Sequence, residues 1–100
     1  MYTFKVISYE YLKEYEELII DKINFIKSKK PLWIMCNDLT VKKPFIIKLL
    51  KKEGLLPKKM HYKSFRFEQY DDEGKVFLIE NNSKNIPLFL IEEIEEREVF

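Results

Sequence analysis

The sequence predicts one compact α+β domain, in which helices pack on a mostly antiparallel or mixed sheet. The chain has 100 residues, the length of one small domain, and residues 1–100 are taken as a single domain. Its composition is globular, with 46% hydrophobic and 35% charged residues. Segments with helical spacing alternate with segments rich in strand-forming residues. The order of these segments is β-α-β-α-β-β, followed by a helix or a strand.

The N-terminal part predicts a short strand and then the longest helix of the chain. Residues 2–7 are rich in strand formers. From residue 9 to residue 28, apolar residues recur at steps of three and four, and acidic residues lie opposite them. This spacing is typical of an amphipathic helix. Ser8 is a suitable N-cap, and Pro31 follows the helix end.

The middle of the chain predicts a buried strand and a second helix. The apolar run at 32–36 has the length of a buried strand, although periodicity alone also allows a short helix. Asp38 or Thr40 is the expected cap of the next helix, with Pro44 tolerated in its first turn. Gly54 is the expected residue just past the end of this helix.

The last forty residues predict a hairpin and an ambiguous tail. Residues 60–70 alternate well, residues 71–74 form a turn, and residues 75–80 return as a strand. Residues 86–100 fit a helix that begins near Pro87. A strand through Pro87–Ile91 is the alternative, because acidic residues crowd the C-terminal half, where the helix dipole disfavours them.

The net charge of +1 conceals two charged blocks. Residues 31–63 hold eight lysines against two acidic residues, and residues 64–100 hold ten acidic residues against four basic ones. Such asymmetry indicates either a charged partner or two regions that neutralise each other in the fold.

The residue types that usually catalyse reactions or bind cofactors form no recognisable motif in this sequence. Cys36 lies in an apolar run, and the single histidine, His61, is far from it in the sequence. One cysteine and one histidine cannot supply a four-ligand zinc site. We therefore expect no catalytic residue, no cofactor and no metal, and a protein that is not an enzyme.

Composition also bears on location and origin. The longest apolar runs are far shorter than the roughly 20 residues that cross a bilayer, and no secretory signal pattern opens the chain. We expect a cytoplasmic protein without a membrane partner. The chain has no alanine, and lysine greatly outnumbers arginine, which indicates an AT-rich genome such as that of a low-GC bacterium or its phage.

One hypothesis is binding of DNA or RNA by the basic region 42–63. The run from Leu50 to Leu56, followed by a hairpin, resembles the recognition helix and wing of winged-helix proteins. That resemblance implies a regulator that contacts nucleic acid. The helix is about a turn short for that family, and the segment before it fits a strand better than a helix. The lysines expected to contact phosphates are Lys48, Lys51, Lys52, Lys58 and Lys59.

The sequence favours binding of another protein over binding of nucleic acid. Small proteins of phages and mobile elements are often inhibitors or adaptors of host enzymes. The acidic tail would dock on a basic surface, and tyrosines would anchor the contact. The residues assigned to this contact are Glu92, Glu93, Glu95, Glu96, Tyr62 and Tyr70. The sequence leaves the partner's identity and the oligomeric state open.

Overall fold

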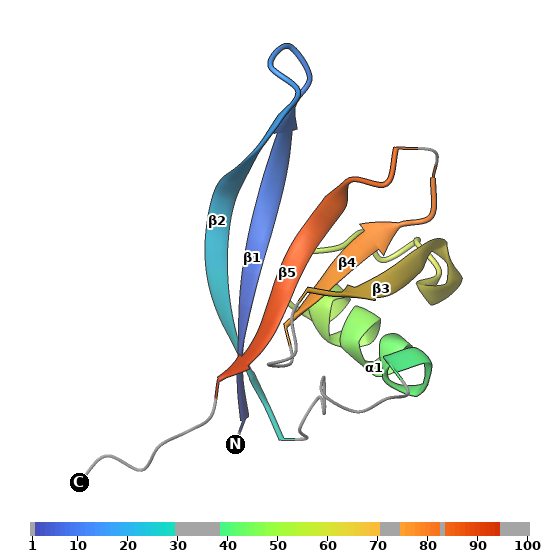
Figure 1. Cartoon of the computed structure of the whole chain (residues 1–100). Helices are drawn as coiled ribbons and strands as arrows, with labels where there is room; N and C mark the ends of the chain where they lie inside the picture. Colours follow the sequence, from blue (N-terminus) through green and yellow to red (C-terminus); the bar gives the residue numbers. More distant parts are fainter. Residues whose placement is uncertain (1, 30–38, 71–74, 83, 95–100) are drawn as a thin grey trace, which may run out of the picture.

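The described part of the chain folds as one antiparallel sheet with one α-helix against it (Figure 1). The computed structural model describes residues 2–29, 39–70, 75–82 and 84–94, with the side chains of 39–43 excepted. Its elements are β1 (Tyr2–Leu12), β2 (Glu17–Ser28), α1 (Leu39–Lys52), the 3-10 turn η1 (Tyr62–Ser64), β3 (Phe65–Gln69), β4 (Val76–Glu80) and β5 (Pro87–Ile94). The strands are ordered β2-β1-β5-β4-β3, and each neighbouring pair is antiparallel. The predicted α+β fold with several helices is therefore wrong, because the described chain is mostly β.

The largest correction concerns residues 9–28, where the predicted helix is the greater part of a long β-hairpin. β1 begins where a strand was predicted, but it continues to Leu12. A turn at 13–16, with a positive φ of 48° at Glu16, leads into β2. The pairing of β1 with β2 passes from Ser8 opposite Lys22 to Tyr9 opposite Ile20. Asp21 is therefore an extra residue, a β-bulge, in β2.

The bulge explains why the hairpin resembles a helix in sequence. Side chains alternate between the faces of a strand with a period of two, so one extra residue lengthens one step to three. The apolar residues on one face of β2 consequently fall at positions 18, 20, 23 and 25, and those on the other face at 19 and 26. Together they imitate the steps of three and four that indicate a helix. The four isoleucines of β2 favour a strand, because β-branched side chains suit a pleated surface.

The other elements follow the sequence more closely. The hairpin of β3 and β4 is confirmed, although β3 begins only at Phe65, after η1. The tail adopts the strand alternative, and β5 lies between β1 and β4. α1 ends before Gly54 as predicted, but Pro44 lies inside the helix rather than in its first turn. Four predicted features lie outside the described residues: the run at 32–36, the cap at Asp38, the turn at 71–74, and the tail beyond Ile94. Thr40, the other predicted cap, lies inside α1.

The sheet has two unlike faces. The inner face packs against α1 and encloses the core, and the outer face is turned away from the helix (Figure 1). The inner face supplies Phe4, Val6, Ile26, Phe65, Val76, Leu78, Phe89 and Ile91 to the core, and α1 supplies Ile46, Ile47 and Leu50. On the outer face the ring of Phe77 lies 6.3 Å from that of Tyr9 and 5.1 Å from that of Tyr70.

Candidate functional site

The end of α1 turns the chain back along the helix. Gly54 has a φ of 75°, its N–H donates to the carbonyl of Lys51 (3.0 Å), and the N–H of Leu55 donates to the carbonyl of Leu50 (2.9 Å). These two bonds form a Schellman motif, in which glycine supplies the left-handed residue. Leu50 and Leu55 both pack in the core cluster, which fixes the direction of the returning chain. The lysines that follow Pro57 are therefore brought beside those of the helix.

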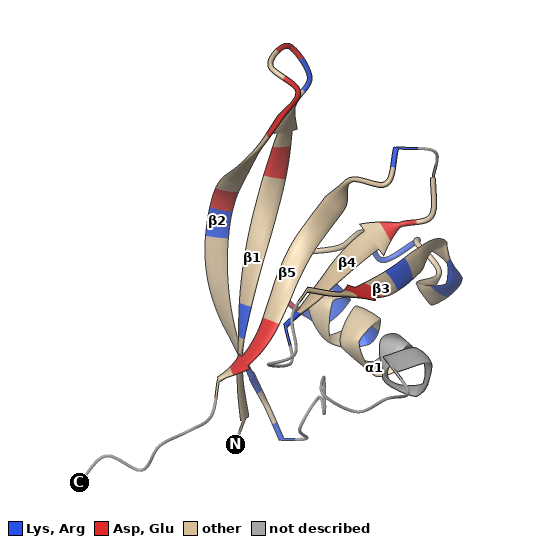
Figure 2. Cartoon of the chain, viewed as in Figure 1, with Lys and Arg blue, Asp and Glu red and all other residues tan. Residues whose placement is uncertain are grey.

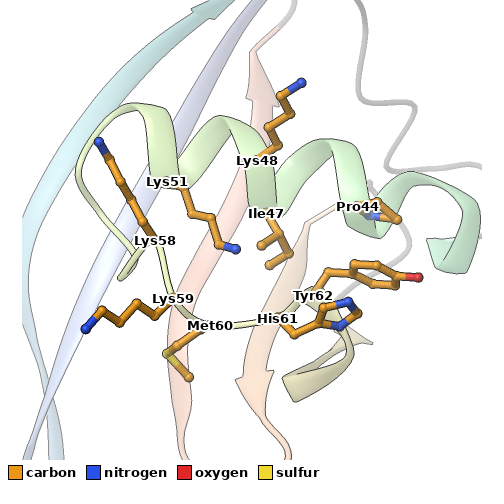
Figure 3. A pocket seen from close by; sticks show the side chains of 9 residues that line it. All are labelled: Pro44, Ile47, Lys48, Lys51, Lys58, Lys59, Met60, His61 and Tyr62. Carbon is orange, nitrogen blue, oxygen red and sulfur yellow. The ribbon is translucent and has the colours of Figure 1, made fainter.

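An open pocket of about 320 Å³ lies between α1 and this returning segment (Figure 3). Lys51 extends into the pocket from the helix, whereas Lys48 and Lys59 point outward from it in different directions (Figure 3). Its lining residues are Pro44, Ile47, Lys48, Lys51, Lys58, Lys59, Met60, His61 and Tyr62. The pocket thus has apolar walls with ammonium groups along its edge.

The charge of this basic pocket is of one sign. Four of its nine lining residues are lysines and none is acidic. Lys51 is half-buried, and Lys48, Lys58 and Lys59 are exposed. Figure 2 shows the basic residues along α1 and the segment after it, away from the acidic tip of the β1–β2 hairpin. A concave surface that carries one sign of charge concentrates ions of the opposite sign, so the pocket suits an anion.

An aromatic pair borders the basic pocket. The rings of His61 and Tyr62 lie against each other in a tilted arrangement, with centroids 4.4 Å apart and planes inclined by 31°. His61 is exposed, and its Nδ1 accepts a hydrogen bond from the N–H of Lys63 (3.2 Å). In the neutral imidazole the proton must then be on Nε2, which is left as a donor. The pair offers a planar apolar surface with a hydrogen-bond donor at its edge.

The structure brings together most of the basic residues singled out from the sequence. Lys48, Lys51, Lys58 and Lys59 line one pocket, whereas Lys52 is exposed on α1 outside its lining. The winged-helix resemblance extends only to the helix end and the hairpin that follows. In the described residues α1 is the sole α-helix and packs on a five-stranded sheet.

The four described residues assigned to a protein contact lie at separate places on the surface. Glu92 and Glu93 are half-buried on β5, and Glu92 lies opposite Lys5 of β1, so one acidic residue of the block has a basic cross-strand neighbour. Tyr70 is exposed and packs edge-on against Phe77. Tyr62 borders the basic pocket instead. Glu95 and Glu96 lie outside the described residues.

Sequence reasoning missed a second hollow and an exposed apolar strand. A hollow of about 330 Å³ lies between the β2 bulge and the segment after α1, and it is lined by Ser8, Asp21, Lys22 and Glu80 among others. The Ser8 hydroxyl is buried without a hydrogen-bond partner. The lining carries both signs of charge, so it favours no one class of ligand. The exposed strand is β2. Its bulge at Asp21 interrupts the alternation of apolar and polar residues that would have indicated a strand.

Neither a metal-binding cluster nor a membrane-spanning helix is present in the described residues. No three His, Cys, Asp or Glu side chains gather there in a way that could hold a metal ion. The described chain also contains no helix with the length and apolarity that a membrane crossing requires.

Comparison with known proteins gives no match to a family model, to a curated protein or to a solved structure.

Proposed function

We propose that the protein acts by binding, without catalysis, and that the basic pocket binds the phosphate backbone of a single-stranded nucleic acid in the cytoplasm. The observation that carries this proposal is that four lysines, from α1 and the returning segment, line one pocket without an acidic residue. Lysine is a mobile point charge on a long stem, so such a cluster can follow a flexible phosphate chain. Four lysines of the basic block at 31–63 thus lie on one surface.

The aromatic pair favours single strands over a duplex. Unpaired bases expose their faces, and stacking of one base on an aromatic side chain contributes about 1–3 kcal/mol. His61 is exposed beside the lysines and lies against Tyr62, so a base could extend this aromatic surface. Sequence selectivity should be low, because arginine, the usual reader of base edges, does not line the basic pocket.

The sequence alone placed a protein partner first, and the geometry favours the reverse order. Glu92 and Glu93, the described acidic residues assigned to a protein contact, are half-buried on β5, and Glu92 lies opposite Lys5 within the sheet. Four lysines, in contrast, line one pocket. A role as inhibitor or adaptor of a host protein remains our second hypothesis, and the exposed apolar residues of β2 are the observation that favours a protein contact.

The proposal is tested by the salt dependence of binding. Fluorescence anisotropy with a labelled single-stranded oligonucleotide should give binding that weakens with salt. The slope of log K against log salt should be about −3, because each neutralised phosphate contributes about −0.7. In the double variant Lys51→Ala/Lys58→Ala the slope should fall to about −1.4.

A matched control separates the pocket from net charge. Lys13→Ala/Lys29→Ala removes the same charge at two exposed residues outside the basic pocket, and it should keep the parental slope. His61→Ala should weaken binding about tenfold at an unchanged slope, because it removes a stacking surface rather than a charge. Absence of binding at about 50 mM salt, or equal loss in both double variants, would refute the proposal. Preference for a duplex of the same length would refute the single-strand assignment.

A further inference from the structure

The edge strand β2 exposes a row of apolar side chains on the outer face of the sheet. β2 is the first strand in the order of the sheet, and no described strand lies beyond it. The exposed fractions of its outer-face residues are 36% for Leu18, 56% for Ile20, 45% for Ile23 and 62% for Phe25. A long apolar edge strand is a site where another strand adds, unless charges or proline protect it. Between Leu18 and Phe25 the charges of β2, Asp21 and Lys22, are confined to the bulge between two apolar pairs, so the apolar parts of this edge are a candidate site for strand addition.

We propose that the occupant is a second copy of the chain, whose β2 pairs antiparallel with β2 of the first about a two-fold axis between Asp21 and Lys22. The two sheets would join edge to edge. The argument rests on the pattern of β2 itself, and it is independent of the proposed function of the basic pocket.

The apolar residues select this register. A two-fold axis perpendicular to a sheet keeps each face on its own side, so outer-face residues must oppose outer-face residues. Because of the bulge, these residues fall at 18, 20, 23 and 25, which is symmetric about the point between 21 and 22. Leu18 then lies opposite the second copy's Phe25, and Ile20 lies opposite the second copy's Ile23. Each exposed apolar residue of one copy thus meets an apolar residue of the other.

The charges select the same register. Asp21 and Lys22 are both exposed, and both are at the bulge. With the axis between them, Asp21 of each copy lies opposite the second copy's Lys22, so two opposite-charge pairs form. Directly opposed charges of unlike sign stabilise a strand pair, and like charges destabilise it.

Neighbouring registers lose this complementarity. If one strand slides by two residues in one direction, Lys22 lies opposite the second copy's Ile23. If it slides by two in the other direction, Asp21 lies opposite the second copy's Ile20. A slide by one residue exchanges the faces and sets Asp21 or Lys22 opposite its own equivalent. One register therefore satisfies the four exposed apolar residues together with Asp21 and Lys22, and it sets Glu17 opposite the second copy's Ile26 near the ends of the paired segment.

The first test is the oligomeric state of the full chain. Sedimentation equilibrium over a range of concentrations should show a monomer–dimer equilibrium. Ile20→Lys should raise the dissociation constant at least about 100-fold, because two apolar contacts per dimer are lost and two charges are buried. Tyr70→Lys changes a side chain of similar exposure (53%) that is not on β2, and it should leave the equilibrium unchanged. Circular dichroism and a melting curve check that each variant is folded.

A charge exchange tests the register even if Ile20→Lys misfolds. Asp21→Lys alone and Lys22→Asp alone should each weaken the dimer about tenfold, because each converts two attractive pairs to repulsive ones. The double variant Asp21→Lys/Lys22→Asp restores opposite charges in the proposed register and should recover the parental constant.

Three results would overturn the proposal. One is a monomer at every concentration, which includes the case where another part of the chain covers β2. Another is a dimer that survives Ile20→Lys in a folded protein. The third is failure of the double exchange to restore what the single reversals lose.

Discussion

Replacement of Gly54 tests the turn that builds the basic pocket. Its φ of 75° is in the left-handed region, where an L-residue with a Cβ is strained. A Cβ added at Gly54 would meet no heavy atom within 4 Å apart from its chain neighbours. Gly54→Ala therefore adds backbone strain without a collision, so no steric clash contributes to the measured loss.

The expected size follows from two opposing effects. The left-handed conformation costs an L-residue about 1–2 kcal/mol. Alanine also restricts the unfolded chain, which returns about 0.4–1 kcal/mol. We therefore expect Gly54→Ala to lower the free energy of unfolding by about 1 kcal/mol, and the melting temperature by about 4–8 °C for a chain of this size. Gly54→Asn should lower the free energy of unfolding by less than Gly54→Ala does, because asparagine tolerates this conformation better than alanine.

The assay is urea unfolding followed by circular dichroism. The control is Lys52→Ala, an exposed change at the helix end, which should alter stability by less than about 0.5 kcal/mol. If Gly54→Ala is neutral or stabilising, or if Gly54→Asn is no better than Gly54→Ala, the left-handed turn is not present and the position of Lys58 and Lys59 beside α1 loses its basis.

Two further predictions concern Tyr9 and Arg66. Burial, and secondarily the nearby Tyr70, raise the pKa of Tyr9 above its ordinary 10.0. The unfolded chain then releases this proton at a lower pH than the folded chain, so stability is at its full value below pH 10 and falls as the pH rises above it. Tyr9→Phe should reduce that fall, as measured by urea unfolding at intervals from pH 8 to pH 11; an identical fall in the variant would contradict the assignment. Arg66 donates to Glu68 Oε1 (3.1 Å), Asn81 Oδ1 (3.2 Å) and Asn85 Oδ1 (2.7 Å), which fastens the loop between β4 and β5 to β3. Arg66→Lys keeps the charge but not the planar guanidinium, and it should lower the free energy of unfolding by about 1 kcal/mol. An unchanged midpoint of urea unfolding would show that the guanidinium geometry contributes nothing to stability.

The sequence predicted the local elements better than the fold class. The β3–β4 hairpin has regular alternation, so Phe65 and Phe67 could be assigned to the core side and Arg66 and Glu68 to the other. Residues 9–28 failed because a bulge at Asp21 gave the strand a helix-like spacing. β2 is also specified by its pairing with β1, which extends to Ser28 opposite Tyr2, and such non-local pairing overrides local pattern.

The candidate site was predictable in part for the same reason. The lysines near Gly54 were visible because the helix end is a local motif with a recognisable glycine. Their placement along one pocket depends on the direction of the returning chain, which the core contacts of Leu55 and Leu56 determine. The position of Glu92 opposite Lys5 could not be foreseen, because it arises from the pairing of residues at opposite ends of the chain.

The two edges of the sheet differ, and this difference bears on how an assembly ends. β2 is a strand of 12 residues with an apolar outer face, whereas β3, at the opposite edge, has five residues and carries Arg66 and Glu68 on that face. Unlimited growth of a filament needs two edges that fit one another. Joining of β2 to β2 consumes the matching edge of both copies and leaves short, charged strands at the ends. A sheet built in this way ends at two chains. The apolar edge that the monomer exposes then leads to a dimer and not to amyloid-like polymers.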